Sequence, residues 1–412
     1  MKYILNYFIS FACVLGTIAI INWFVDPFGM HWSPTISNVN ALKPGSGTRT
    51  RITKAYQANT ISPDVLIVGN SRVEMGLSPK STQFKNKKVY NQGMPGAHLV
   101  MQMDYAINTI KTTPNIESIL VGVDFVDFLL SEKQINLQHK ILDQSIKASY
   151  SFRLKSQDIK HSYSAAILRL KEIMALIFSL DAFNASLSTI MLQKSLSSSI
   201  DKLGFNSALS YLSIMKTEGI KPLFTQKLQE VTSRLKTPLY IASPENPSYS
   251  PRFIHLKNLI NEATKNKIKV TIFINPYHYS YLHVLSDQGQ WQNFLTWKEG
   301  LTSFVHEVNS TYDDFEVNLW DFSGFNSIIN EAVPLDMPKN NMLWFWEPAH
   351  YRKELGEKIL ARMLAKDKSM NIDFGRRLLQ ENIQAYISED IIGIQKSLKK
   401  WQELKEGLAL YN

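Results

Sequence analysis

The sequence predicts an α/β fold, in which helices cover both sides of a mostly parallel sheet. Short apolar runs rich in branched residues recur along the chain, and helical patterns separate them. With 412 residues, of which 44% are hydrophobic and 20% charged, the chain has the composition of a globular protein and the length for a large core.

The expected strands are apolar runs whose length suits burial on both faces. They are residues 64–69, 88–90, 118–123, 268–274 and 315–320. The expected helices are residues 96–111, 252–265, 291–308 and 352–364. Strands that alternate with helices in this way are typical of a parallel sheet.

The same patterns divide the chain into segments. We expect a transmembrane anchor (1–25), a lead-in segment (26–60), an α/β domain in two parts (61–130 and 246–370), a helical insertion (131–245) and a helical tail (371–412). Within the insertion, apolar residues recur at helical spacing in 165–178 and near 203–214. We expect this insertion to form a lid or substrate-binding cap at the carboxyl edge of the sheet.

Residues 4–24 form an apolar stretch about as long as the roughly 20 residues that a helix needs to cross a bilayer. The stretch ends without a small-residue cleavage site, which favours an uncleaved anchor over a signal peptide, with a buried globular helix as the alternative. Lys2 precedes the stretch, and residues 25–42 hold no Lys or Arg. The positive-inside rule therefore predicts a single-pass protein of the cytoplasmic membrane with an extracytoplasmic, periplasmic body.

The formal net charge of +9 is spread along the chain without a long basic run, so we expect no nucleic-acid partner. A solvated basic surface is the favoured interpretation, and affinity for anionic lipid headgroups or an anionic glycan is the alternative. The single cysteine, Cys13, lies in the anchor, which excludes a disulfide within the chain. The histidines lack the spacing of a zinc site, so we predict no metal and no cofactor.

Ser71 is the first candidate for chemistry, because Gly69, Asn70, Ser71 and Arg72 directly follow the first predicted strand. Parallel sheets bind ligands at the carboxyl ends of their strands. Backbone amides at the start of the following helix can stabilise negative charge there. The alternative is a strand-end turn in which Ser71 only caps a helix.

Two further motifs follow. The turn Asn91-Gln-Gly93-Met-Pro-Gly96 comes after the second strand, where glycine lets the backbone approach a ligand closely. Late in the chain, His350 can serve as general base to a serine, and Glu347, three residues earlier, can orient its ring. Taken alone, an ordinary turn and a surface histidine explain these motifs equally well.

In this order, the motifs resemble those of the SGNH (GDSL-like) hydrolase superfamily. The resemblance implies that Ser71 is the nucleophile, that Gly93 supplies an oxyanion-hole amide, and that Glu347 and His350 are the acid and the base. It also implies a flavodoxin-like three-layer α/β/α sandwich of about five parallel strands.

The chain is most similar to membrane-anchored SGNH proteins of bacterial exopolysaccharide and cell-wall acylation systems. The anchor ends in Asp26-Pro27-Phe28-Gly29, and the late motif continues into Tyr351, as in those proteins. The resemblance implies a serine esterase or O-acyltransferase acting on acetyl esters of a cell-surface polysaccharide. Its expected partners are the membrane, the polysaccharide and a membrane-bound acyl-transferring protein.

Two positions depart from the family pattern. Asp124 stands where the family carries an asparagine that completes the oxyanion hole, and an ionised carboxylate would repel an oxyanion. We therefore expect Asp124 to bind substrate, to pair with Arg72, or to mark weakened catalysis. Glu347 replaces the commoner aspartate, and if its loop does not adjust, His350 acts with Ser71 in a dyad.

Other residues and functions stay open at this stage. Asp321 is a reserve candidate for the acid, and His278 is interpreted as a hydrogen-bonded loop histidine rather than a substrate contact. Residues 344–346 (Trp-Phe-Trp) suit either a sugar- or acyl-binding face or the core. The rival functions are a glycan-binding or assembly protein with a degraded site, and an esterase directed at lipids.

Overall fold

The computed structural model describes residues 1–136, 140–158, 163–236, 238–242, 249–312, 314–335, 342–364 and 374–410. Its main sheet has the order β2-β1-β3-β6-β7-β8. These strands are β1 (Val65–Val68), β2 (Val89–Asn91), β3 (Ser118–Val123), β6 (Lys269–Ile274), β7 (Val317–Asp321) and β8 (Arg376–Arg377). The first five are parallel, which confirms the predicted α/β fold.

The antiparallel edge strand β8 was not predicted. It consists of two arginines, and no apolar run marks them as a strand. The central strands, in contrast, are buried on both faces: all four residues of β1 are buried, and five of the six residues of β3. Parallel strands covered on both sides need this continuous apolar run.

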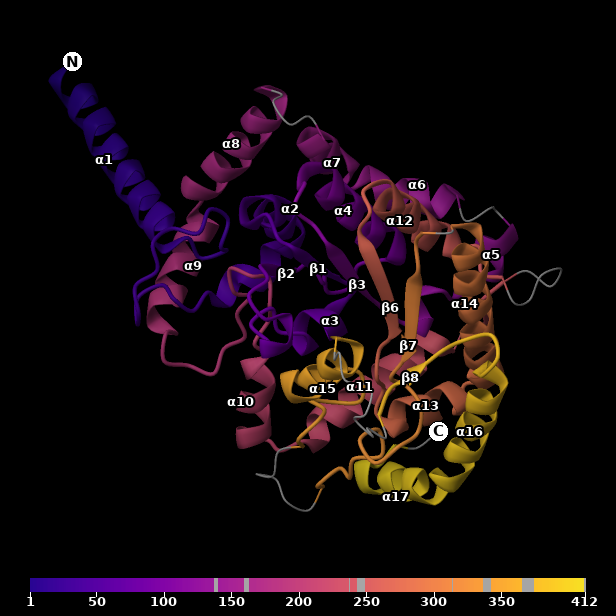
Figure 1. Cartoon of the computed structure of the whole chain (residues 1–412). Helices are drawn as coiled ribbons and strands as arrows, with labels where there is room; N and C mark the ends of the chain where they lie inside the picture. Colours follow the sequence, from indigo (N-terminus) through magenta and orange to yellow (C-terminus); the bar gives the residue numbers. More distant parts are fainter. Residues whose placement is uncertain are drawn as a thin grey trace.

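Helices cover both faces because the chain reverses its direction along the sheet after β2. A right-handed crossover places α3 (Ser71–Gly76) on one face and α4 (Leu99–Thr112), α12 (Phe253–Lys265) and α14 (Trp291–Thr311) on the other. The last helix of the domain, α15 (Lys353–Leu364), packs against α3 (Figure 1). The strand order, apart from β8, is that of flavodoxin-like sheets.

The N-terminal helix α1 (Lys2–Val25) projects from the body (Figure 1) and is long and apolar enough to span a membrane. Its end is held by the segment that follows it. The Asp26 carboxylate accepts the amides of Met30 and Trp32, both at 2.8 Å. The buried Lys43 ammonium donates to the carbonyls of Val25 and Asp26, both at 2.9 Å. These contacts fix the base of α1 to the body.

The lead-in segment is more ordered than its composition suggests. It contains the 3₁₀ helix η1 (Pro44–Arg49) and the helix α2 (Thr50–Ile61), which packs against α4. The Thr- and Asn-containing sequence of α2 lacks strong helix formers. Burial of residues such as Ala55, Tyr56 and Ala58 against the body compensates for this weak propensity.

The described part of the insertion is mainly helical. Its helices are α5 (Glu132–Asn136), α6 (Lys140–Ala148), α7 (Ser151–Asp158), α8 (Tyr163–Ile177), α9 (Leu180–Met191), α10 (Leu209–Thr217) and α11 (Lys221–Leu235). Two short strands, β4 (Leu130–Ser131) and β5 (Leu239–Tyr240), pair antiparallel at its two ends. The remaining elements are η2 (Thr82–Phe84), η3 (Phe125–Asp127), α13 (Tyr279–Asp287), α16 (Ile383–Lys396) and α17 (Leu398–Leu408).

A buried ionic network connects the tail to the sheet. Lys298 of α14 lies 2.9 Å from Asp321 at the end of β7 and 2.7 Å from Asp390 of α16. Arg376 of β8 pairs with the same two carboxylates, at 2.6 and 2.9 Å. Because each buried charge has oppositely charged partners, removal of one leaves the others uncompensated.

We expect Lys298→Met to lower the free energy of unfolding by about 3–5 kcal/mol, because it leaves two buried carboxylates short of a cation. Thermal unfolding in detergent, followed by tryptophan fluorescence, measures this. Lys399→Met is the matched control, because Lys399 is exposed and lies 3.9 Å from Glu403. Equal melting temperatures for the two variants would contradict a structural role for the network.

Candidate active site

The first site residue, Ser71, opens α3 directly after β1, at the point where the strand order reverses. This reversal is the usual ligand position in open α/β sheets. Asn70 caps the helix, and its side-chain oxygen accepts the amide of Arg72 at 3.0 Å. The cap aims the first turn of α3 at the carboxyl edge of the sheet.

Ser71, His350 and Glu347 form a continuous hydrogen-bonded chain. The Ser71 Oγ lies 2.7 Å from Nε2 of His350, and Nδ1 of the same ring contacts Oε1 of Glu347 directly. Glu347 and His350 are buried, whereas Ser71 is partly exposed. The structure thus brings together three residues that the sequence analysis singled out, and the hydroxyl stands at their solvent-facing end.

The electrostatics of Glu347 suit this chain. Burial raises the pKa of its carboxyl, but His350 and the Ala349 amide, which donates to Oε2 at 2.8 Å, outweigh burial, so the pKa lies below its usual range. Glu347 is therefore ionised at neutral pH and accepts the Nδ1 proton of His350. Nε2 is then left to accept the Ser71 hydroxyl proton.

A tight hairpin-like loop positions Glu347 and His350. The Trp346 amide donates to the His350 carbonyl at 2.9 Å, and the Arg352 amide donates to the Trp344 carbonyl at 2.8 Å. Phe345 and Trp346 are buried, and the Arg352 guanidinium lies 4.4 Å from the Trp346 ring centroid. These two aromatic side chains therefore serve packing rather than an open sugar-binding face.

Close packing of α3 against α15 sets the distance between the serine and the histidine. A Cβ on Gly76 would meet the Tyr351 ring at 1.9 Å, and a Cβ on Gly356 would meet the Gly76 carbonyl oxygen at 1.8 Å. Only glycine fits at either position. Since Tyr351 adjoins His350, this contact joins the two halves of the site.

The Asn91–Gly96 turn lies against the first turn of α3, but its groups are engaged within the protein. The Gly93 amide donates to the Asn91 side-chain oxygen at 2.8 Å, and the Asn91 amide group donates to the carbonyls of Val73 and Leu77. A Cβ on Gly93 would come within 2.8 Å of the Glu74 amide nitrogen. Here glycine permits a close approach of two backbone segments.

A buried ion pair under this turn was missed by the sequence analysis. Lys54 of α2 lies 2.7 Å from Glu74 of α3, contacts the Gly93 carbonyl and donates to the Gly204 carbonyl at 2.9 Å. Burial lowers the pKa of the Lys54 ammonium, against the opposing effect of Glu74. A lysine in a polar lead-in gave no signal that it would reach the site.

Asp124, at the end of β3, is fully buried and pairs with Arg72, whose Nε lies 3.0 Å from it. The guanidinium also lies over the rings of Tyr277 and Tyr281, at 4.2 and 4.7 Å. The Asn70 amide group donates to the other carboxylate oxygen. Of the roles considered for Asp124, the structure places it in the pairing with Arg72, away from solvent.

Asp127 of η3 is a second acidic residue at the site that the sequence analysis did not single out. Its Oδ2 accepts from Gln102 at 3.2 Å and from Asn70 at 3.4 Å, so it lies one residue from the Ser71 turn. Burial first, and then the nearby Asp124 charge, raise the pKa of the Asp127 carboxyl to about 7.

The insertion also reaches the site. Tyr211 of α10 stacks on Trp346 at 6.0 Å and lies 6.2 Å from the His350 ring, as measured between ring centroids. In Figure 1, α10 lies beside α15 and α3. The insertion therefore contributes a wall of the site, which agrees with its expected place at the carboxyl edge.

The remaining candidates lie elsewhere. His278 is buried between Ser280 and the Glu331 carbonyl, to which its Nε2 donates at 2.9 Å, and burial lowers its pKa to about 3. Asp321 belongs to the ionic network of Lys298 and Arg376 and is not the acid of His350. The interpretation of His278 as a hydrogen-bonded loop residue is confirmed.

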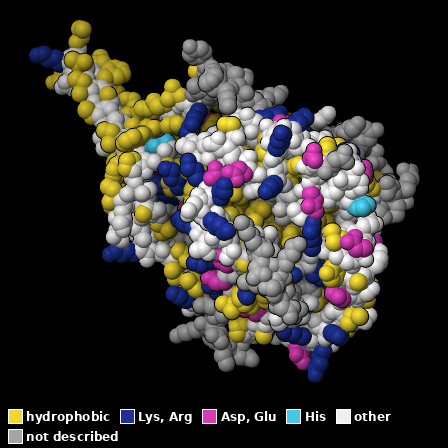
Figure 2. Space-filling model, in the orientation of Figure 1, with side chains coloured by type: hydrophobic (Ala, Val, Ile, Leu, Met, Phe, Trp, Pro, Cys, Tyr) yellow, Lys and Arg dark blue, Asp and Glu magenta, His cyan; other side chains and the backbone are white. Residues whose placement is uncertain are grey.

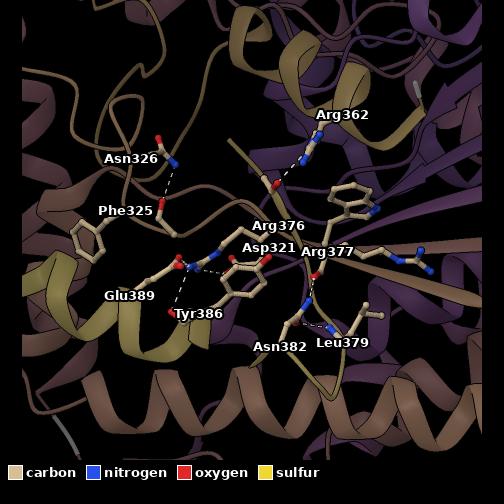
Figure 3. Close-up of a pocket in the computed structure, with 13 residues that line it drawn as sticks. Asp321, Phe325, Asn326, Arg362, Arg376, Arg377, Leu379, Asn382, Tyr386 and Glu389 are labelled. Carbon is tan, nitrogen blue, oxygen red and sulfur yellow. Dashed lines mark hydrogen bonds and ion pairs between the residues drawn. The ribbon is translucent and has the colours of Figure 1, made fainter. Parts of the chain in front are cut away.

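A pocket of about 410 Å³ lies at the β7–β8 edge and is distinct from the Ser71 site. Figure 3 shows its lining, in which Arg376 turns toward Asp321 and Glu389 while Tyr386 and Asn382 close one side. Its arginines are paired with carboxylates of the protein: Arg376 with Asp321, Asp390 and Glu389, and Arg377 with Glu316. The pocket therefore holds no excess of free positive charge for an anion.

Within the described ranges, no group of three or more His, Cys, Asp or Glu side chains is arranged to hold a metal ion. No protein-family model matches the chain, and no curated protein matches it either. The chemistry must therefore be argued from the site itself.

We expect Gly356→Ala to reduce any activity of Ser71 more than it reduces stability, because the new methyl group pushes α15 and His350 away from α3. Hydrolysis of an activated acetate ester and the melting temperature measure the two effects. Gly47→Ala is the control, since a Cβ there meets nothing within 4 Å. Full activity in Gly356→Ala would show that this packing does not set the site geometry.

We expect Asp127 to make stability depend on pH. Its folded pKa of about 7 exceeds the ordinary value, so the folded state holds this proton more tightly than the unfolded state. The stabilisation is complete below about pH 4 and is lost as the pH rises through about 7. The melting temperature of the wild type should therefore fall relative to Asp127→Asn between about pH 5 and about pH 8.

The exposed Asp181 supplies the control for this measurement. Asp181→Asn should follow the wild-type pH profile throughout the range. Parallel profiles for wild type and Asp127→Asn would show that the Asp127 carboxyl titrates normally.

Proposed function

We propose that this chain is a membrane-anchored serine esterase or O-acyltransferase of the SGNH type. The observation that carries the proposal is the Ser71–His350–Glu347 chain at the switch point of a parallel sheet. The flavodoxin-like strand order and the sequence order of the motifs support the same assignment. The site needs neither metal nor cofactor for this chemistry.

In the proposed reaction, Ser71 Oγ transfers its proton to Nε2 of His350 and bonds to the carbonyl carbon of an ester. The resulting tetrahedral intermediate collapses as the ester C–O bond breaks, and His350 returns the proton to the leaving oxygen. Water or a sugar hydroxyl then gives its proton to His350 and attacks the acyl-serine, which restores the free enzyme. Glu347 stabilises the imidazolium in both halves.

The developing oxyanion needs a donor, and the Ser71 amide is the one we propose. Ser71 is the first residue of α3, and the first amide of a helix has no acceptor within that helix. The Gly93 amide can join only if it exchanges the Asn91 oxygen for the oxyanion. Asp124 takes no part, because it is buried against Arg72.

The substrate class follows from the anchor and the resemblance. We propose acetyl esters of a cell-surface polysaccharide, handled in the periplasm beside the cytoplasmic membrane. A polymer can reach a site that α1 holds near the bilayer, and a membrane-bound acyl-transferring protein could supply the acyl group there.

A second candidate is a glycan-binding or assembly protein that keeps the fold without turnover. The engagement of the Gly93 amide by Asn91 favours it, because removal of one oxyanion donor typically costs catalysis about a hundredfold or more. This candidate predicts polysaccharide binding that persists in Ser71→Ala and no reaction of the native serine.

We expect the full-length protein in detergent to react with a fluorophosphonate probe and to hydrolyse nitrophenyl acetate faster than longer-chain esters. Ser71→Ala and His350→Ala should lower kcat/KM at least about a thousandfold, because each removes a reacting group. Glu347→Gln should lower it less than either, provided that His350 keeps its position.

Ser78→Ala and His306→Ala are the matched controls, since both residues are accessible and lie outside the hydrogen-bonded chain. They should keep labelling and turnover. A folded protein that neither labels nor turns over would overturn the enzymatic proposal in favour of the binding one. Preference for long-chain esters would instead point to a lipid substrate.

A further inference from the structure

Helices α8 and α9 carry apolar side chains on the molecular surface. On α8, Ile167, Leu170, Met174 and the adjoining Phe178 are 42–58% exposed and recur every three or four residues. On α9, Leu180, Leu187 and Met191 are 66%, 42% and 81% exposed and also fall on one helical face. The two stripes form one surface, which we call the α8–α9 face.

The polar residues of α8 lie on its opposite side. Arg169 lies over the Tyr56 ring at 5.3 Å, and Glu172 contacts the Tyr56 hydroxyl and pairs with Arg153 at 2.7 Å. These contacts tie α8 to α2 and α7 and fix its rotation. The apolar stripe is therefore directed away from the body by construction, and not by a loosely held helix.

The α8–α9 face is continuous with the base of α1. Asn22 of α1 donates to the carbonyls of Ile177 and Ser179, at 2.8 and 3.0 Å, and accepts from Ser186 at 2.9 Å. These three bonds hold the bend between α8 and α9, which turns the chain by 67°. In Figure 1, α8 and α9 diverge from the foot of α1, and Figure 2 shows hydrophobic side chains along α1 and on the adjoining part of the body.

The level of this bend relative to a bilayer follows from α1. Asn22 is next to Trp23, and tryptophan prefers the membrane–water interface. Between Ile173 and Leu192 the only charged residue is Asp181, whereas exposed lysines, Lys171 and Lys194, flank the segment. Apolar residues bounded by lysines are typical of helices that lie in the interface of a membrane with anionic lipids.

We propose that the α8–α9 face is buried in the outer interface of the bilayer that α1 spans, so that the body rests on the membrane through three helices. The occupant of this face is lipid, because the face continues the surface of a helix that meets lipid itself. A single flexible anchor would leave the body free to tilt, whereas the α8–α9 contact fixes its orientation. This inference does not depend on the chemistry proposed for Ser71.

Site-specific fluorescence tests the proposal in the full-length chain. Cys13 is the only cysteine, so Cys13→Ser provides a background for single labels with the environment-sensitive fluorophore NBD at Leu180→Cys and Met191→Cys. Lys399→Cys is the matched control, because the Lys399 side chain is 89% exposed on α17. Each protein is reconstituted into vesicles of phosphatidylcholine and phosphatidylglycerol, and far-UV circular dichroism checks that it is folded.

The labels at 180 and 191 should emit at shorter wavelength than the label at 399. They should also lose fluorescence severalfold when the vesicles contain lipids with a nitroxide near the headgroup end of the acyl chain, whereas the label at 399 keeps its intensity. Quenching at 180 and 191 no greater than at 399 would overturn the proposal. A blue-shifted emission without quenching would also overturn it, because a second copy of the chain would then cover the face.

Discussion

The candidate site depends on one close contact, between the end of α3 and the start of α15. At Gly76 and Gly356 the two helices approach so closely that no side chain fits between them. This contact joins a segment that follows β1 to one that follows β7, and it holds the Ser71 hydroxyl 2.7 Å from His350. Interiors are close-packed and transmit displacement, so the chemistry rests on this packing rather than on the hydrogen bond alone.

Around that contact, the carboxyl edge of the sheet is built from paired buried charges. Lys54 with Glu74 supports the Gly93 turn from below, and Arg72 with Asp124 fills the space beside the Ser71 turn. Each pair is further hydrogen-bonded or stacked on aromatic rings, as buried ions require. Such a frame restricts the movement of the serine turn, which is what pre-organised catalysis needs.

Much of the fold could be predicted from sequence, because parallel strands buried on both faces leave continuous apolar runs such as 118–123. The pairing of Ser71, His350 and Glu347 could also be anticipated from motif order. The engagement of Gly93 by Asn91, the reach of Lys54 and the position of Asp127 could not. They depend on long-range packing, and neither a lysine in a polar helix nor a two-residue strand such as β8 leaves a periodic pattern.

The nucleophile and its base are separated by 279 positions along the chain. During synthesis, which proceeds from the N-terminus, the serine turn is complete long before the loop that carries His350 is made. Until then Ser71 is an ordinary hydroxyl with no general base beside it. The reactive centre is therefore armed only when nearly the whole protein has been produced, and truncated chains remain chemically inert.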